Sequence, residues 1–190
     1  AAIIEKTPKA TALYRSAGQK IICTNHYQSE EFVEDEYNKE NIATSDSPYR
    51  YERLSELLTE NRPIDHIDAA YILRNRYGIG NKDIGVGNEK SINQFIAHHS
   101  VIFQPKELRM WVSSAPWQLG EYVCYDLNEV FDCVGTESYA IDAYNIAADS
   151  VLMSDDYSRI VSFRERYTEI KHAVDEGLQL SEEYIEDFIN

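Results

Sequence analysis

The sequence has little of what would define a disulfide-rich, membrane or secreted protein. Its three cysteines, Cys23, Cys124 and Cys133, are too few and too widely spaced for a disulfide scaffold. No apolar run approaches the roughly 18 residues that a membrane-spanning helix needs, and the first residues, AAIIEKTPKA, lack the long apolar core of a signal peptide. We therefore expect a soluble chain. Because it begins with Ala1 rather than Met, any targeting signal would lie upstream, and the sequence does not fix a compartment.

Basic residues are scarce relative to acidic ones. The chain has 18 Lys and Arg against 33 Asp and Glu, which gives a formal net charge of −15. A surface of this sign repels phosphate backbones and anionic lipids, so we expect no nucleic-acid partner. With 190 residues, 43% of them hydrophobic, the chain can still bury a core, and its length favours one domain or one large piece of a domain.

β-branched and aromatic residues bounded by turns predict several strands. IIEK and ATALYR, followed by the turn Ala17-Gly18 and then KIICTNHY, are predicted to pair. NQFIAHHSVIFQP and ELRMWVSSAP form a predicted hairpin across Pro105. Both faces of its first run are largely apolar, which indicates a strand covered on both sides. EYVCYDLNEVF is predicted to add a strand that leads into a turn or short helix.

Helix signals appear in the middle of the chain. Ser47 as an N-cap and Pro48 at the first helical position predict a helix that runs to about Asn61. A second helix is expected after Pro63, with Gly78 in the C-cap position.

Three more segments complete the predicted elements. The acidic segment 28–45 is predicted to be an exposed loop or a short helix. From Ser154, apolar residues at helical spacing predict an amphipathic helix that ends near Gly177, and SEEYIEDFIN is predicted to close the chain as a short acidic helix. Residues 145–190 would thus form a mainly helical C-terminal segment.

The stretch CTNHY places a thiol, a hydroxyl, an amide and an imidazole on neighbouring residues. On a strand, Cys23 and His26 point to opposite faces and cannot easily form the hydrogen-bonded pair that a thiol nucleophile needs. Asn25 would share a face with Cys23 and Tyr27. Its amide either donates to an oxyanion or simply turns the chain at the end of the strand. Cys23 is expected to be a buried neighbour of Asn25.

Other candidate sites have simpler alternatives. His98 and His99 suggest a metal, but adjacent strand residues diverge and no third ligand has a recognisable spacing, so each is expected to be a core histidine. The glycine-rich segment 77–88 has neither GxGxxG nor GK[ST] and is predicted to be a flexible loop. We predict no metal and no cofactor. Trp111 is expected in the core or at the rim of a pocket.

Two arginines, Arg50 and Arg53, lie three residues apart in SPYRYERL, on one face of the predicted helix. An arginine in this position can hold a carboxylate or steer a thiolate. It can also form a surface pair with Glu52 or Glu56. Spacing alone does not decide between these roles.

Four segments in a particular order carry a family resemblance. They are TNHY after a hairpin, SPYRYER at a helix start, IAHHSVIFQPKELRMWVS in a hairpin, and YVCYDL. Together they resemble the acyl-coenzyme A:6-aminopenicillanic acid acyltransferase family, C45-type members of the N-terminal nucleophile hydrolases that are related to choloylglycine hydrolase and penicillin V acylase. The resemblance covers residues 3–130.

The resemblance implies an α+β fold that is part of an αββα sandwich, with antiparallel sheets packed between outer helices. It also implies cleavage of linear amide bonds by an N-terminal cysteine, whose thiol attacks the acyl carbonyl while its own α-amino group acts as the base. Asn25 resembles the family's oxyanion-hole asparagine, and Arg50 resembles the arginine near the nucleophile, so these two are the catalytic candidates. His26, Tyr27 and Trp111 are the candidates for the substrate pocket.

One departure from the family shapes the functional hypothesis. Residue 1 is Ala and Cys23 is internal, so residues 1–190 are expected to be the C-terminal portion of one N-terminal nucleophile hydrolase-like domain, inactive alone. The expected partners are the N-terminal portion of the same protein and a small-molecule amide substrate. Self-association is also expected, because a truncated sandwich exposes sheet edges. Two alternatives stay open: a non-catalytic ligand-binding or structural module, and a hydrolase that uses Cys23 with His98 or His99.

Overall fold

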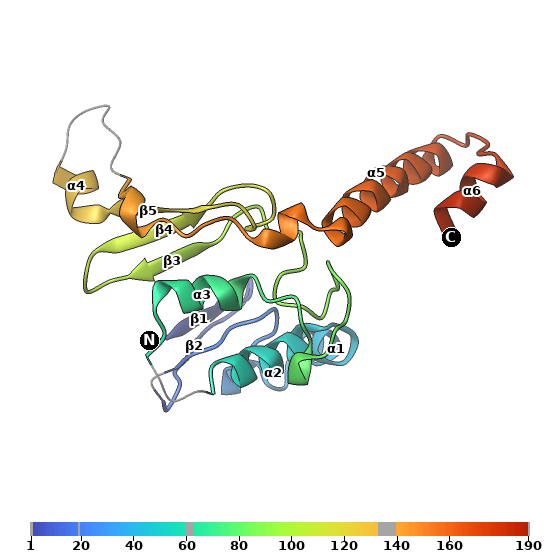
Figure 1. Cartoon of the computed structure of the whole chain (residues 1–190). Coiled ribbons are helices and arrows are strands. Elements are labelled where there is room, and N and C mark those ends of the chain that lie inside the picture. The colour runs from blue at the N-terminus through green and yellow to red at the C-terminus, as the bar shows by residue number, and fades with distance from the viewer. Residues whose placement is uncertain (1, 19, 60–62, 133–139, 190) are drawn as a thin grey trace.

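The computed structural model describes residues 2–18, 20–59, 63–132 and 140–189, and these residues form a mixed α+β structure (Figure 1). Two small antiparallel sheets lie in this part of the chain, with the strands β1 (Ile3–Lys6), β2 (Thr11–Tyr14), β3 (Val101–Gln104), β4 (Arg109–Ser113) and β5 (Tyr122–Asp126). The helices described here are α1 (Glu36–Thr44), α2 (Ser47–Leu57), α3 (His66–Leu73), α4 (Leu127–Asp132), α5 (Asp155–Asp175) and α6 (Glu182–Ile189). Short 3₁₀ helices are η1 (Glu30–Phe32), η2 (Ile79–Asn81), η3 (Asp142–Tyr144) and η4 (Ser150–Met153). The expected α+β class is confirmed.

The first sheet is the antiparallel hairpin of β1 and β2, as predicted. The prediction of a further strand over residues 20–27 is wrong, because this segment is irregular. Its backbone donors are used elsewhere: the N–H of Asn25 donates to the Ser47 hydroxyl, and the N–H of Tyr27 donates to the side-chain oxygen of Asn38. An N–H that is bonded to a side chain is lost to a strand ladder.

The helices α1 and α2 follow this irregular segment. The acidic segment 28–45 contains α1, so the helical alternative is confirmed there. α2 begins at Ser47 itself, and Asp46 occupies the N-cap position, so the predicted cap at Ser47 is wrong by one residue. The Ser47 hydroxyl contacts residues 20–27 instead of the first turn of its own helix. α2 ends before Asn61, which lies outside the described residues.

The helix α3 begins with a capping box. Asp65 accepts a hydrogen bond from the Asp68 N–H at 2.8 Å, and the Asp68 carboxylate accepts one from the Asp65 N–H at 3.2 Å. The helix ends with Arg74 in the C-cap position, so the predicted C-cap at Gly78 is wrong. Gly78 instead precedes η2, where a side chain would meet the Tyr49 hydroxyl at 2.5 Å.

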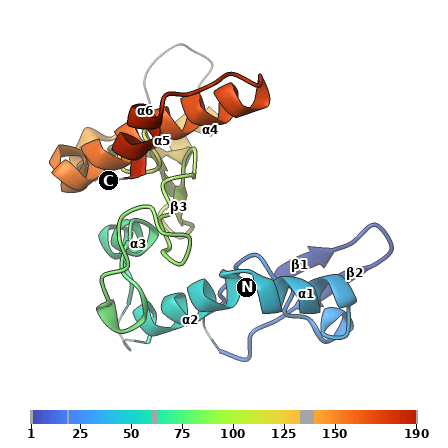
Figure 2. The same ribbon diagram turned by 90° about the vertical axis from the view of Figure 1, so that its right-hand side faces the viewer.

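The second sheet has the order β3-β4-β5, which agrees with the predicted hairpin and the strand after it. Ile102, Trp111 and Cys124 lie opposite one another across this sheet and are buried in one apolar cluster with Ala70 of α3. Figure 2 shows α3 beside β3. The opposite face is open, since Phe103 is 63% exposed. Cover on both sides of this strand, as the sequence predicts, is therefore absent from the described part of the chain.

The first strand of this hairpin is shorter than predicted. β3 starts at Val101, and residues 93–100 are irregular. Phe95 has a φ of 56°, in the left-handed region that a strand does not contain. Its N–H donates to the side-chain oxygen of Asn93 at 3.0 Å. The apolar alternation before Val101 therefore belongs to a loop.

The C-terminal helices form an arm that projects from the sheets (Figure 1). α5 begins after the N-cap Ser154, and Gly177 follows its end with a φ of 67°, so both predicted ends are confirmed. The predicted short helix after it is also confirmed, as α6, and it packs against α5 through Phe163 and Phe188, whose rings stack at 5.2 Å. Within the described ranges, no helix is long and apolar enough to cross a membrane.

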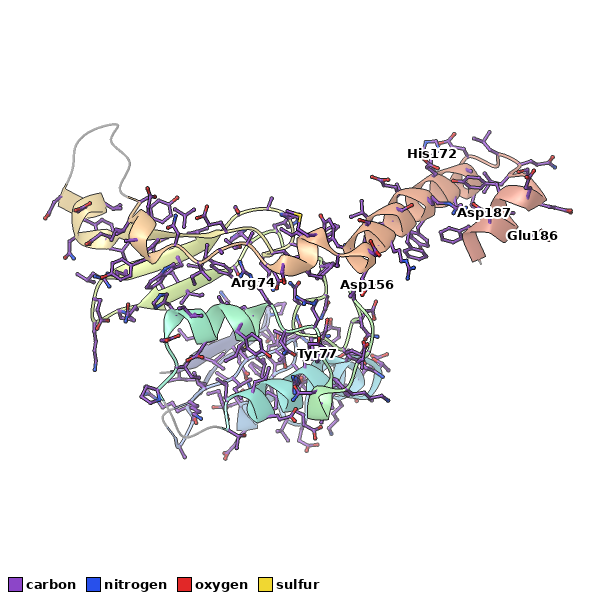
Figure 3. All side chains as sticks on the ribbon, viewed as in Figure 1. Arg74, Tyr77, Asp156, His172, Glu186 and Asp187 are labelled. Carbon is purple, nitrogen blue, oxygen red and sulfur yellow. The ribbon has the colours of Figure 1, made fainter. Side chains whose placement is uncertain are left out.

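Arg74, labelled in Figure 3, joins the end of α3 to two distant segments of the chain. Its side chain is buried and donates to the carbonyl oxygens of Gln118 at 3.2 Å, Gly120 at 2.6 Å and Ala147 at 2.9 Å. Its guanidinium also lies over the Tyr122 ring, 4.8 Å from the centroid. One cation thus satisfies three carbonyl groups that irregular backbone would otherwise leave unpaired.

We expect Arg74→Met to lower the free energy of unfolding by about 3 kcal/mol, because three acceptors lose a charged donor while the aliphatic volume stays similar. Chemical denaturation monitored by circular dichroism would measure this change. Arg159→Met is the matched control, because Arg159 is exposed on α5, and it should change stability little. Equal stability of the two variants would contradict the role given to Arg74.

Candidate functional site

The hydroxyl of Ser47 is the anchor of the CTNHY stretch. Ser47 is fully buried, and its Oγ accepts a hydrogen bond from the Asn25 N–H at 2.7 Å. The same Oγ lies 2.8 Å from His26 Nδ1 and donates to Thr24 Oγ1 at 3.1 Å. Thr24 in turn donates to the Ser47 carbonyl at 3.2 Å. The first residue of α2 therefore fixes three consecutive residues of the preceding loop.

Two further side chains hold the next residues of this loop. Asn38 of α1 accepts from the Tyr27 N–H at 2.9 Å and donates back to the Tyr27 carbonyl at 3.3 Å. Glu5 of β1 accepts from the Gln28 N–H at 2.7 Å and from the Ser29 N–H at 3.0 Å. Asn38 and Glu5 are both buried, so their hydrogen bonds are shielded from water.

Asn25 and Arg50, the two catalytic candidates, are in direct contact. Arg50 Nη2 donates to Asn25 Oδ1 at 2.8 Å, and Arg50 Nη1 donates to the Glu89 carbonyl at 2.7 Å. A guanidinium can only donate, so the atom that faces it must be the amide oxygen. The amide NH₂ of Asn25 then points elsewhere, and among the described residues none accepts a hydrogen bond from it. The Asn25 carbonyl is held by Asn41 Nδ2 at 2.5 Å.

His26 lies beside this pair, with its ring edge to face with Tyr51 at 5.7 Å. Burial lowers the pKa of His26 below its ordinary value, and the positive charge of Arg50 acts in the same direction, while Glu5 opposes both. The imidazole is therefore expected to be neutral at neutral pH. Its Nδ1 is in hydrogen-bond contact with the Ser47 hydroxyl. This contact gives His26 a structural role in holding the loop.

Tyr27, a pocket candidate, lies on the other side of the loop. Its hydroxyl donates to the Lys6 carbonyl at 3.0 Å, and its ring packs against Phe32 at 4.8 Å. The tyrosine therefore connects the loop to the end of β1.

Two hollows lie on either side of Asn25. The β1 hollow has a volume of about 300 Å³ and is lined by Ile3 and Ile4 together with Glu5, Lys6, His26, Tyr27, Tyr37, Asn38 and Asn41. The α2 hollow has a volume of about 480 Å³ and is lined by Arg50, Leu54, Leu73, Ile92, Gln94, Ile96 and Ala97. Cys23, Thr24 and Asn25 line both hollows. Asn25 thus borders both hollows.

Trp111, the remaining pocket candidate, lines neither hollow. It is fully buried in the second sheet, its ring stacks on His66 at 4.7 Å, and its Nε1 donates to the Tyr144 carbonyl at 2.8 Å. Of the two places expected for Trp111, the structure gives the core. A strand tryptophan with a satisfied N–H is adequately explained by packing.

The cysteines that the structure describes lack the surroundings of a reactive thiol. Cys23 is exposed, so the expectation of a buried residue is wrong. Partial desolvation and the Glu5 carboxylate raise the pKa of its thiol, and burial raises the pKa of the Cys124 thiol in the sheet core. A raised pKa keeps a thiol protonated and unreactive. Cys133 lies outside the described residues.

No histidine is bonded to Cys23 within the described residues. Its Sγ donates to the Thr24 carbonyl at 3.5 Å, while His26 Nδ1 is taken by Ser47. Cys23 and His26 are not hydrogen-bonded to each other, as predicted, but strand alternation is not the reason, because the segment is irregular. His98 and His99 are exposed, so the expectation that they are core histidines is wrong. In the described ranges, no group of three or more His, Cys, Asp or Glu side chains is placed to hold a metal ion.

The two arginines of α2 have different roles. Arg53 is fully buried, forms an ion pair with Glu56 at 2.6 Å, and also donates to Asn75 Oδ1 at 3.2 Å and Asn81 Oδ1 at 2.6 Å. Glu56 is one of the partners expected, but Arg53 is buried, so the pair is not the surface pair of the simpler alternative. Arg50 instead contacts Asn25, and the sequence offers no signal for that contact because the two residues belong to different elements.

Comparison with known proteins gives the family. The contact between Asn25 and Arg50 places the candidate site in the first part of the chain, where the Asn25 NH₂ group has no acceptor among the described residues. A family model described as acyl-coenzyme A:6-aminopenicillanic acid acyl-transferase matches residues 1–116, which is more than half of the chain. The chain therefore belongs to this family, and its membership indicates an acyltransferase- or hydrolase-type function. No curated protein and no solved structure matches the chain.

We expect Ser47→Ala to loosen the loop, because the Asn25 N–H loses its acceptor at a cost of about 1–3 kcal/mol. Hydrogen exchange of the Asn25 amide should become roughly tenfold faster or more. Ser55→Ala is the matched control, since the Ser55 hydroxyl donates only to the Tyr51 carbonyl within α2. Unchanged exchange at Asn25 in the Ser47 variant would show that this hydroxyl is not the anchor.

Proposed function

We propose that this chain provides part of the active site of an enzyme that transfers or hydrolyses acyl groups held in linear amide bonds. The observation that carries the proposal is the hydrogen bond from Arg50 Nη2 to Asn25 Oδ1 at 2.8 Å. It orients the Asn25 amide so that its NH₂ group is available to a ligand. Family membership supports the same class of reaction.

Acyl transfer from an amide requires a hydrogen-bond donor of this kind. When a nucleophile adds to an acyl carbonyl, negative charge develops on the carbonyl oxygen, and a donor that is already oriented stabilises this charge without reorganisation. Asn25 is held at its N–H by Ser47, at its carbonyl by Asn41 and at its side-chain oxygen by Arg50. We assign Asn25 the role of oxyanion donor and Arg50 the role of a positioning residue.

The nucleophile in this proposal is a cysteine outside the 190 residues, carried by an N-terminal portion of the same protein. The raised pKa of Cys23 and the burial of Cys124 support an external thiol. The thiol adds to the acyl carbonyl, the C–N bond breaks, and the amine leaves with the proton that the thiol has lost. Water or an acceptor amine then releases the acyl group from sulfur.

The fold proposed for the complete protein is the αββα sandwich. In this arrangement the N-terminal portion packs on the open face of the second sheet, at Phe103, and brings its cysteine to the Asn25 amide. Phe103 is 63% exposed and is the apolar side chain on this face that such packing would cover.

In the complete protein, we expect Asn25→Ala to lower kcat by about two orders of magnitude, because one oxyanion donor is lost. Stability should change little, since the Asn25 side chain is exposed. Steady-state hydrolysis of a chromogenic amide would measure kcat, and Asn128→Ala, at an exposed site in α4, is the control.

Two results would contradict this function. An unchanged kcat in the Asn25 variant would remove Asn25 from the site and favour a non-catalytic ligand-binding module. Hydrolysis by the 190-residue chain alone that Cys23→Ala abolishes would place the nucleophile inside this chain.

A further inference from the structure

The α2 hollow is more aliphatic than its neighbour on the other side of Asn25. Five aliphatic residues line it: Leu54, Leu73, Ile92, Ile96 and Ala97. The charged residue at its edge is Arg50, whose two terminal nitrogens are already bonded to Asn25 Oδ1 and the Glu89 carbonyl. An apolar group that enters this hollow therefore leaves both of these Arg50 hydrogen bonds in place.

The walls of the α2 hollow are fixed by hydrogen bonds. Leu54 lies one turn after Arg50 on the same face of α2. The wall formed by residues 92–97 is irregular, but Arg164 of α5 donates to the Phe95 carbonyl and to the Gln94 carbonyl, the latter at 3.2 Å. A wall that is held in this way before a ligand arrives loses little entropy on binding.

We propose that the α2 hollow binds the apolar acyl chain of the substrate, and that the β1 hollow receives the amine side of the same amide. The assignment rests on the proposed function of Asn25. A carbonyl bound to the Asn25 amide has two substituents, and they leave it in different directions. The α2 hollow is the more aliphatic of the two, so it takes the apolar substituent, and the β1 hollow is left for the other. The substrate class is amides of apolar, uncharged acyl chains.

The test uses binding, so it does not depend on turnover. The 190-residue chain is titrated with butanamide, hexanamide and octanamide, and the dissociation constants are measured by isothermal titration calorimetry. Each methylene that leaves water should tighten binding about fourfold. A dissociation constant that stays flat along the series would overturn the proposal.

Variants locate the binding within the molecule. Ala97→Leu fills part of the α2 hollow and should weaken octanamide at least tenfold while butanamide binding is kept. Ala148→Leu is the matched control at an exposed position and should leave the series unchanged. Tyr37→Ser alters the β1 hollow, where Tyr37 is 74% exposed, and should keep the dependence on chain length. If Tyr37→Ser and not Ala97→Leu removes this dependence, the acyl chain lies in the β1 hollow and the assignment is wrong.

A second variant guards against a folding defect in Ala97→Leu. Ile96 is 63% exposed, so Ile96→Ser should fold normally and should reduce the gain per methylene. The same titration of the complete protein identifies the occupant of the α2 hollow. Binding by the isolated chain but not by the complete protein would show that a segment of the protein itself fills this hollow. That result would overturn the proposal. Chain-length dependence together with an unchanged kcat in Asn25→Ala would keep the hollow and reject the oxyanion role.

Discussion

The backbone N–H groups of residues 25, 27, 28 and 29 donate to side chains, and the candidate site depends on this arrangement. The acceptors are Ser47 of α2, Asn38 of α1 and Glu5 of β1, all of them buried. A buried donor without a partner costs free energy, so each of these bonds restricts the loop to one path. Because the acceptors belong to three different elements, the same bonds also tie β1, α1 and α2 to one another.

The position of Asn25 is a consequence of this path. Its N–H, carbonyl and side-chain oxygen are all bonded within the protein, and the amide NH₂ is the group left for a ligand. Arg50 decides which end of the amide faces inward, since a guanidinium pairs with an oxygen. The hollows on either side of Asn25 then give a bound carbonyl compound two distinct directions. In the proposed function, the orientation of the Asn25 donor and the directions open to the substrate thus both depend on this loop.

Local signals predicted the elements that depend on local interactions. The β1–β2 hairpin, the β3–β4 hairpin, and α5 with its cap at Ser154 and Gly177 at its end are examples. The strand predicted over residues 20–27 failed because two of its N–H groups, those of Asn25 and Tyr27, donate to side chains 22 and 11 residues away, at Ser47 and Asn38. No periodicity encodes such pairs. Asn25 and Arg50 were found through family motifs, and their contact needed the structure.

The claim that Arg50 acts through Asn25 is tested most directly by a double-mutant cycle on kcat in the complete protein. The variants are Asn25→Ala, Arg50→Met and the two together. If Arg50 only positions the Asn25 amide, the double variant should be no slower than Asn25→Ala alone, because the residue being positioned is already gone. Losses that multiply, so that the double variant is slower by the product of the single effects, would show that Arg50 acts on the substrate independently and would contradict the account.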